Sequence, residues 1–322
     1  MRCILIDNPG QSSRLTISEQ ALPTCQREEI LVQVKATAIN RADLLQRQGK
    51  YPPPVGESII PGLEVAGEVV DVGSDVTRFQ KGDRIYGLVA AGAYAEYCCV
   101  NQNLAELIPN NWSYAYAAAL PEALVTAHAT VFLLGQLQQG QTLLIHAAGS
   151  GITSLAIQMA KLKGAKIIST ASSEEKILKA KKLGVTTLIN YKKEDFETVL
   201  EERSIDIIVD FIGGSYFPKH LKLLKSQGKL IQIACMQGHL VEANLLLVMQ
   251  KRLQINGFVL RPQSLLEKIE LWRSAQKLWA TSLLNQHIAP VIDSEFRFED
   301  MEQAHARMQN NEHFGKIVVT LS

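Results

Sequence analysis

The stretch that most constrains the fold lies at residues 142–191, where an apolar run passes through small residues directly into a helical pattern. Residues 143–145 are Leu-Leu-Ile, residues 147–151 are Ala-Ala-Gly-Ser-Gly, and a second apolar pair stands at residues 167–168. The order strand, glycine turn, helix, strand is the unit that holds a dinucleotide pyrophosphate at a helix N-terminus.

The glycine turn matches only part of the GxGxxG signature. Gly149 and Gly151 occupy the first two glycine positions, whereas Ser154 stands where the third small residue belongs. An ordinary βα turn of a flavodoxin-like sheet gives the same partial match. Four more strand–helix alternations follow, and they favour dinucleotide binding.

Strands and helices alternate through the middle of the chain. The predicted strands are residues 143–146, 166–169, 187–190, 206–211, 229–234 and 254–260. Several of them are continuous apolar runs, which are typical of a parallel sheet covered on both faces. The sequence therefore predicts an α/β fold with a doubly wound parallel sheet.

The first 110 residues have a different texture, with many short strands and glycines at the corners. Residues 49–61 contain four prolines and form a stiff loop that cannot join a central strand. This pattern predicts a small barrel or sandwich. The elements after residue 262 are too few for a domain, so we expect them to dock onto the N-terminal β-unit, which makes the parallel sheet an insert.

Charge and hydropathy exclude some classes of partner. The net charge is +1, which gives no electrostatic reason to expect nucleic acid or an anionic membrane as a partner. The most apolar long stretch, residues 115–134, contains Pro121, Glu122 and His128 and is expected to form buried helices. No signal peptide is expected, and the predicted location is the cytoplasm.

Five cysteines, at positions 3, 25, 98, 99 and 235, form no CxxC pair and no cluster with zinc-ligand spacing. An odd number fits reduced thiols better than a disulfide framework. We therefore expect free cysteines.

The end of the second strand bears on the choice between NADH and NADPH. An NAD site places an Asp or Glu there for the ribose 2′-hydroxyl, but residues 169–173 contain no acid. Hydroxyl groups, a helix N-terminus and Lys176 suit a 2′-phosphate instead, which favours NADPH. Ser172 with Glu175 also fits a simple capping box, and the two interpretations are compatible.

Residue choice elsewhere indicates a family. The motifs are Asn40-Arg-Ala-Asp43-Leu, Gln48-Gly49-Lys50-Tyr51-Pro-Pro-Pro, Pro61-Gly62-Leu63-Glu64-Val-Ala-Gly67, Gly92-Ala93-Tyr94-Ala95-Glu96-Tyr, Pro121-Glu122-Ala-Leu-Val-Thr126-Ala, Asn190-Tyr191-Lys, Gly213-Gly214-Ser-Tyr and Phe314-Gly315-Lys316. Together they closely resemble the zinc-free quinone oxidoreductases of the medium-chain dehydrogenase/reductase superfamily. The nearest subgroup is the tumour-suppressor-inducible type related to zeta-crystallin, and the resemblance covers essentially the whole chain.

The resemblance implies a GroES-like domain of residues 1–118 and 262–322 and a Rossmann NADPH-binding domain of residues 119–261. It places Asn40 and Thr126 near the nicotinamide and Tyr51 in the substrate cleft. The other implied cofactor contacts are Gly149, Ser150, Gly151, Ile152 and Thr153 on the pyrophosphate, Ser173, Lys176 and Tyr191 on the 2′-phosphate, and Ile212, Gly213, Cys235, Met236, Phe258, Val259, Leu260, Phe314 and Lys316 along the groove. Relatives commonly form homodimers by pairing the last Rossmann strand, here residues 254–260.

The chain departs from the family in the glycine turn. The family turn reads S-G-V-G, whereas this chain has Thr153 at the last position. Either the threonine hydroxyl joins the phosphate contacts, or the helix stands off and cofactor affinity falls.

The resemblance also implies that catalytic zinc is absent. Zinc-dependent relatives have Cys at the position of Asn40 and His at that of Leu63, and a catalytic zinc needs three protein ligands. His128, His146, His220 and His239 are scattered in the sequence, so each is expected to be a core or surface residue. Without a Lewis acid, the chemistry suits a substrate that accepts hydride readily.

We expect NADPH to stack its nicotinamide between the domains and to reduce a quinone, with Tyr51 acting on the substrate oxygen or serving only as a wall residue. One alternative is an enoyl or 2-alkenal reductase on the same scaffold. Another is a non-catalytic protein that senses NADPH or interacts with RNA. The expected partner is a small-molecule quinone or enone.

Overall fold

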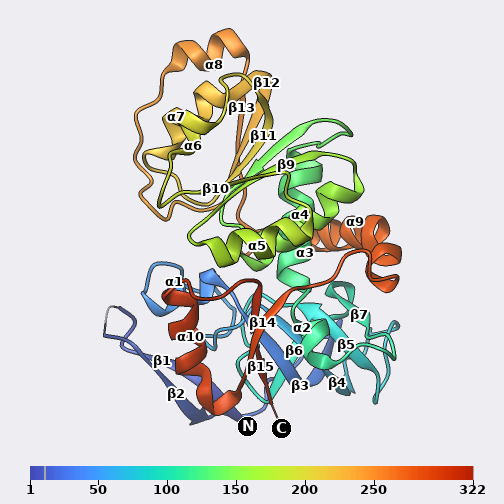
Figure 1. Cartoon of the computed structure of the whole chain (residues 1–322). Coiled ribbons are helices and arrows are strands. Elements are labelled where there is room, and N and C mark those ends of the chain that lie inside the picture. Colours follow the sequence, from blue (N-terminus) through green and yellow to red (C-terminus); the bar gives the residue numbers. More distant parts are fainter. Residues whose placement is uncertain (11, 322) are drawn as a thin grey trace. The chain divides into compact units, whose positions relative to one another are not determined.

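The computed structural model describes residues 1–10 and 12–321 and divides them into two compact units (Figure 1). The first unit contains residues 1–122, 261–273 and 290–321, and the second contains Ala123–Leu260 and Ser274–Ala289. Each unit has its own sheet. The helix α9 (Leu265–Leu284) contributes its first part to one unit and its last part to the other.

The second unit is built on a six-stranded parallel sheet with the order β10-β9-β8-β11-β12-β13. The strands are β8 (Thr142–Ile145), β9 (Lys166–Ala171), β10 (Thr187–Asn190), β11 (Ile205–Asp210), β12 (Leu224–Gln232) and β13 (Gln254–Gly257). The helices between them are α4 (Gly151–Leu162), α5 (Glu174–Leu183), α6 (Phe196–Val199), α7 (Tyr216–Leu223) and α8 (Leu245–Lys251). Their apolar side chains bury the central strands, which confirms the predicted doubly wound sheet.

The strand β13 lies at the edge of the sheet and contains part of the segment predicted to pair in a homodimer. Among the described residues it pairs with β12 alone, and its Ile255 side chain is exposed. An unpaired strand edge is available for pairing with another chain. The homodimer stays a prediction.

The first unit is a mostly antiparallel sheet with the order β14-β15-β3-β4-β5-β7, in which β6 also pairs with β3. The strands are β3 (Glu29–Ile39), β4 (Glu64–Val72), β5 (Arg84–Leu88), β6 (Tyr97–Asn101), β7 (Ala105–Leu107), β14 (Ile292–Arg297) and β15 (Lys316–Thr320), beside a hairpin of β1 (Arg2–Asp7) and β2 (Arg14–Glu19). The helices are α1 (Arg41–Arg47), α2 (Tyr114–Ala118) and α10 (Met301–Gln309). Because β15 pairs with β3, the C-terminal segment returns to the N-terminal β-unit as predicted.

A close backbone approach explains one of the glycines in this sheet. A Cβ at Gly67 on β4 would lie 2.1 Å from the carbonyl oxygen of Gln33 on β3. Only glycine fits there without moving the strands.

The apolar stretch 115–134 forms helices, as predicted. It contains α2, α3 (Pro121–Ala127) and a π-helix, His128–Leu134. In length and hydropathy, Tyr114–Leu134 is the one candidate membrane span among the described residues, and 78% of its most apolar window is buried inside the protein. Such burial is what a core helix shows.

The expectation of five free cysteines is wrong for one pair. Cys25 and Cys99 form a disulfide, although they are 74 residues apart in sequence. Antiparallel pairing of β3 with β6 places Cys99 beside Leu31, close to the segment that leads into β3. Spacing in the sequence cannot show a partner that is brought in by strand pairing.

Removal of this disulfide should destabilise the protein. A cross-link across a loop of 74 residues restricts the unfolded chain and contributes about 2–4 kcal/mol. The Cys25→Ser/Cys99→Ser double variant should lose that much unfolding free energy in guanidinium titrations. Cys235→Ser, which removes an exposed free thiol, is the control. Equal stability of all three proteins under oxidising conditions would contradict the cross-link.

Candidate functional site

The glycine turn joins the end of β8 to the start of α4. Ala147 adopts a left-handed φ of +58°, and Ser150 is the N-cap residue in an extended conformation. The first backbone N–H groups of a helix have no partner within the helix. The N–H groups of Gly151, Ile152 and Thr153 therefore lie where an anion is favoured, as predicted for a pyrophosphate.

The Thr153 side chain points into the core. It is 0% exposed, and its hydroxyl donates a hydrogen bond to the His146 carbonyl at 3.0 Å. The alternative in which this hydroxyl contacts phosphate does not hold in this structure. The hydroxyl instead ties the first turn of α4 to the end of β8.

The residues predicted around a 2′-phosphate come from neighbouring strand ends. Ser173 is the N-cap of α5, and its hydroxyl accepts from the backbone N–H of Lys176 at 3.4 Å. Tyr191 follows β10, and its N–H donates to Ala171 at the end of β9. The cap is thus formed by Ser173 rather than by Ser172. The structure brings Ser173 and Lys176 together at this edge, with Tyr191 on the adjacent strand end.

A carboxylate that the sequence analysis did not weigh also lies at this edge. Glu174 is the first residue of α5, and its Oε1 accepts from Asn190 at 3.3 Å and from Lys193 at 2.8 Å. The Lys193 hydrogen bond is the largest cause that lowers the pKa of Glu174. Since Glu174 is paired with Lys193, its charge is balanced beside the predicted 2′-phosphate site.

Asp210 fixes the next part of the predicted groove. This residue ends β11 and is fully buried, and its two carboxylate oxygens accept from the N–H groups of Ile212 at 2.7 Å and Gly213 at 2.9 Å. Gln232 of β12 donates to the same carboxylate at 2.9 Å. One carboxylate therefore holds the loop after β11 against the end of β12.

The loop after β12 lies directly against the loop after β11. Met236 N–H donates to the Phe211 carbonyl, and the Gly213 backbone leaves no room for a Cβ, which would lie 2.7 Å from the Gly238 carbonyl oxygen. Cys235 and Met236 therefore neighbour the Ile212–Gly213 segment, and their contact with a cofactor stays a prediction. Phe258 and Leu260 follow β13 and are 8% and 9% exposed.

Two histidines that are far apart in the sequence lie in contact near the carboxyl edge of the parallel sheet. His146 and His220 are fully buried, and their Nε2 atoms are 2.8 Å apart. Nδ1 of His220 lies 3.7 Å from Asp210. Burial is the main cause that lowers the pKa of both imidazoles, so both are neutral, and one donates to the other. They are core residues, as expected, but the fold brings them together into one cluster.

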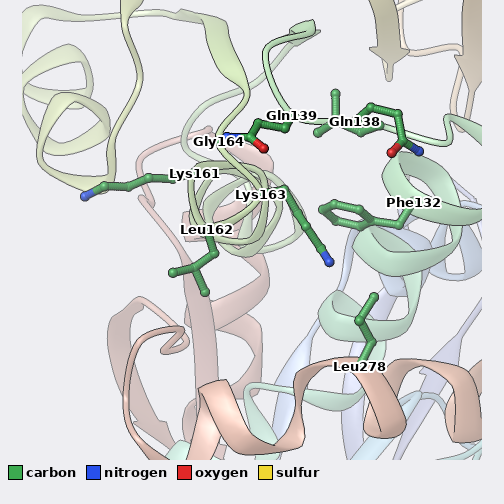
Figure 2. A pocket seen from close by; sticks show the side chains of 9 residues that line it. Phe132, Gln138, Gln139, Lys161, Leu162, Lys163, Gly164 and Leu278 are labelled. Atoms are coloured by element: carbon green, nitrogen blue, oxygen red, sulfur yellow. The ribbon is translucent and has the colours of Figure 1, made fainter.

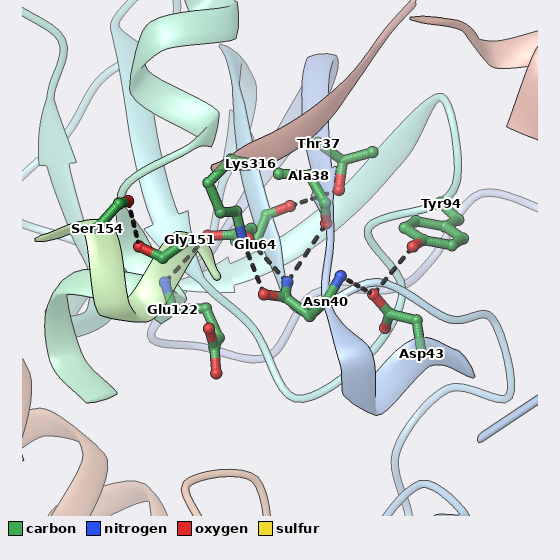
Figure 3. Close-up of polar contacts among 10 residues, drawn as sticks. All are labelled: Thr37, Ala38, Asn40, Asp43, Glu64, Tyr94, Glu122, Gly151, Ser154 and Lys316. Carbon is green, nitrogen blue, oxygen red and sulfur yellow. Dashed lines mark hydrogen bonds and ion pairs between the residues drawn. The ribbon is translucent and has the colours of Figure 1, made fainter. Parts of the chain in front are cut away.

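The first unit contains a buried charged cluster that includes three of the motif residues (Figure 3). Nζ of Lys316 donates to Oδ1 of Asn40 at 2.7 Å and to Oε1 of Glu64 at 2.6 Å. Nδ2 of Asn40 donates to the same Glu64 oxygen at 2.7 Å, and the Glu122 N–H donates to the other at 3.0 Å. The cluster joins the ends of β3, β4 and β15.

A second buried network lies beside this cluster. The hydroxyl of Tyr94 donates to Asp43 at 2.9 Å and lies 3.2 Å from Nε2 of His305. Asp43 also accepts from the Asn40 N–H, which is the N3 half of the predicted capping box. Burial is the largest cause that raises the pKa of Asp43 to about 6.

Tyr51 packs against a residue that the sequence analysis missed. The guanidinium of Arg261 lies 5.3 Å from the centre of the Tyr51 ring, and its Nη1 donates to the Tyr51 carbonyl at 3.2 Å. Burial is the largest cause that raises the pKa of Tyr51 to about 12, so its hydroxyl keeps its proton at neutral pH. Arg261 lies four residues beyond the end of β13, and no motif marks it.

The remaining predicted residues fall in both units. Phe314 is buried in the first unit, where its N–H donates to Asp293 at 2.8 Å. Thr126 is buried in the second unit, and its carbonyl accepts from the Thr130 hydroxyl at 2.7 Å. Their predicted contact with a shared cofactor stays a prediction.

The positions at which zinc-dependent relatives are expected to place ligands carry other side chains with other partners. Leu63 offers no ligand atom, and the amide of Asn40 and the carboxylate of Glu64 are already bonded to Lys316. Among the described residues, the ligand-rich groups are the core cluster His146–Asp210–His220 and the group Cys25–Glu29–Cys99, which contains the disulfide.

One pocket of the second unit contains none of the predicted site residues. It is lined by residues that include Phe132, Gln138, Lys161, Lys163 and Leu278 (Figure 2). The Lys163 ammonium lies over the Trp279 ring. This pocket is separate from the carboxyl edge of the sheet.

Comparisons with known proteins agree with both units. Residues 26–110 match the model of the alcohol dehydrogenase GroES-like domain, and residues 151–274 match that of the zinc-binding dehydrogenase family. A quinone oxidoreductase-like protein 2 homolog of Nematostella vectensis is 30% identical over 90% of this chain and 81% of its own length. The quinone oxidoreductase of Rattus norvegicus is 28% identical over 100% of this chain and 98% of its own length. The crystal structure of the Escherichia coli quinone oxidoreductase complexed with NADPH superposes with a TM-score of 0.89 at 26% identity, over 99% of both chains.

A substitution at Thr153 tests its role in the core. Thr153→Val keeps the shape but leaves the His146 carbonyl without its donor, so unfolding free energy should fall by about 1 kcal/mol in urea titrations. Thr153→Ser, which keeps the hydroxyl, is the matched control. If Thr153→Val is as stable as the wild type but binds NADPH about tenfold more weakly, the hydroxyl belongs to the phosphate site instead.

The pKa of Asp43 predicts a pH dependence of stability. Because burial raises this pKa from 3.8 to about 6, the protonated carboxyl stabilises the fold below pH 3.8, and that contribution is lost as pH rises through about 6. Relative to Asp43→Asn, the wild type should therefore lose about 1.4 kcal/mol per pH unit between these values in chemical denaturation. Asp7→Asn, at an exposed position, is the control. A constant difference between wild type and Asp43→Asn across this range would contradict the raised pKa.

Proposed function

Because this chain belongs to the quinone oxidoreductase-like family of the medium-chain dehydrogenase/reductases, we propose that it reduces quinones with NADPH and without catalytic zinc. The observation that carries the proposal is the buried cluster of Lys316, Asn40 and Glu64. In zinc-dependent relatives this region holds metal ligands. Here a lysine ammonium donates to the carboxylate and amide oxygens, which supports chemistry that proceeds without a Lewis acid.

The carboxyl edge of the parallel sheet supports the choice of cofactor. The first turn of α4 offers N–H groups for a pyrophosphate, and Ser173, Lys176 and Tyr191 suit a 2′-phosphate. Bound NADPH supplies a hydride. Asp210 keeps the Ile212–Gly213 backbone in one conformation, which preorganises the groove.

In the first unit, residues of the chain itself would position the substrate and form hydrogen bonds to it. Lys316 holds Asn40 and Glu64 in fixed rotamers, and Tyr51 keeps a hydroxyl proton that it can donate in a hydrogen bond to a substrate oxygen. Positioning of a readily reduced substrate with exclusion of water suffices for direct hydride transfer. A quinone suits this role because its ring accepts hydride without activation by a metal.

The experiment is steady-state oxidation of NADPH, followed at 340 nm, with 1,2-naphthoquinone, 1,4-benzoquinone and a 2-alkenal as acceptors. We expect turnover of a quinone with kcat/KM well above that of the alkenal, and unchanged after dialysis against a zinc chelator. The opposite preference would assign an alkenal reductase. Tight binding of NADPH with no turnover of any acceptor would contradict an enzymatic role.

Lys176 provides the matching test of cofactor choice. Lys176→Gln should raise the KM for NADPH about tenfold and leave that for NADH unchanged, because one charge-assisted contact to the 2′-phosphate is lost. Lys179→Gln, on the same helix and paired with Glu175, is the control. Equal effects on NADPH and NADH would place Lys176 outside the 2′-phosphate site.

A further inference from the structure

The guanidinium of Arg261 is buried in the first unit with one nitrogen left unused. The residue is 5% exposed; its Nε donates to the Ala90 carbonyl at 2.8 Å and its Nη1 to the Tyr51 carbonyl at 3.2 Å. Within residues 1–10 and 12–321, Nη2 has no acceptor. A buried N–H donor of a charged group that lacks an acceptor costs folding free energy, so a ligand that accepts from this atom would be favoured.

A second buried cation accompanies Arg261. Lys268, on the first turns of α9, is 8% exposed, and in the described part of the chain neither cation forms an ion pair. Asp43 and Glu57 act on Arg261 only at longer range. Burial is the largest cause that lowers the pKa of both cations, and Arg261 lowers the pKa of Lys268 further. Carboxylates act on Lys268 too, namely Glu57 and Glu267, but none of them forms an ion pair with either cation among the described residues. Two buried cations without a carboxylate in contact are complementary to a negative charge.

The surroundings of Arg261 define what kind of anion fits. Two nitrogens of the guanidinium, Nε and Nη1, donate to backbone carbonyls. The face of the group packs on the Tyr51 ring, with 5.3 Å between the guanidinium carbon and the ring centre. A planar guanidinium in a fixed orientation matches the geometry of a carboxylate. Tyr51 is also the residue expected to contact the substrate, so the anion and the reducible ring would belong to one molecule.

We propose that Arg261 and Lys268 form a subsite for a carboxylate on the substrate, so that the preferred substrates are quinones or enones with an acidic side chain. This inference rests on the proposed quinone reduction. Glu57, in the loop of residues 52–58, acts electrostatically on both cations. The tip of that loop stands in solvent, because Val55 is fully exposed and Gly56, with φ of +90°, has no atom within 4 Å of an added Cβ.

The test uses two substrates that differ only in charge, namely a 1,4-naphthoquinone with a propionate side chain and its methyl ester. For the wild type we expect kcat/KM for the carboxylate to exceed that for the ester about tenfold, mainly through KM. In Lys268→Gln and in Arg261→Gln, this ratio should fall to about 1. Lys277→Gln, which removes an exposed charge from the same helix, should keep the wild-type ratio.

Equilibrium binding separates the two proposals. The dissociation constants of carboxylate and ester are measured by calorimetry in the absence of NADPH. If the wild type reduces the ester, and its kcat/KM for the carboxylate is no higher than that for the ester, the subsite proposal is wrong and the proposed quinone reduction is supported. If neither compound is reduced but Lys268→Gln still weakens carboxylate binding about tenfold, the subsite proposal is supported and the proposed quinone reduction is wrong. Weaker NADPH binding by both charge variants, with the ratio kept, would assign the two cations to the cofactor and overturn the subsite.

Discussion

The buried ion pair between Lys316 and Glu64 is the interaction on which the first unit depends. The two side chains are 4% and 0% exposed, and Asn40 completes their hydrogen bonds. Loss of one partner would leave an uncompensated charge in the core, at a cost of about 3–5 kcal/mol. Since the pair joins β15 to the start of β4, it ties the last strand of the chain to the β-unit formed by the first 122 residues. The same contacts use the amide oxygen of Asn40 and a carboxylate oxygen of Glu64.

Asp210 has the corresponding role in the second unit, but it acts on backbone rather than on another charge. Its oxygens accept from Ile212, Gly213 and Gln232, so the carboxylate is satisfied without a cation. Hydrogen bonds of this kind hold an ionised carboxylate in a buried place. The consequence is a rigid loop at the carboxyl edge of the sheet, where a doubly wound fold binds its ligand. Nδ1 of the buried His220 lies 3.7 Å from this carboxylate.

Regular features of the fold were predictable from the sequence, and long-range contacts were not. The apolar runs of β8, β9 and β11 identify a parallel sheet by composition alone. In contrast, Thr153 shows only that a β-branched residue stands in the turn; the direction of its hydroxyl depends on the His146 carbonyl across the turn. Cys25 and Cys99 pair because β3 and β6 are antiparallel neighbours. Arg261 was missed for the same reason, since its partners come from segments that are distant in sequence.

The contrast between the two groups of buried charges in the first unit carries the functional argument. The Lys316 ammonium has acceptors within the fold, since it donates to Asn40 and Glu64 and is paired with the Glu64 carboxylate. Arg261 has the same kind of burial, but its two hydrogen bonds go to neutral carbonyls, which leave the net charge in place. Burial of a cation that has no carboxylate in contact lowers stability. Such a residue makes physical sense where a ligand brings the missing negative charge, and the position of Arg261 against Tyr51 places that charge beside the expected substrate.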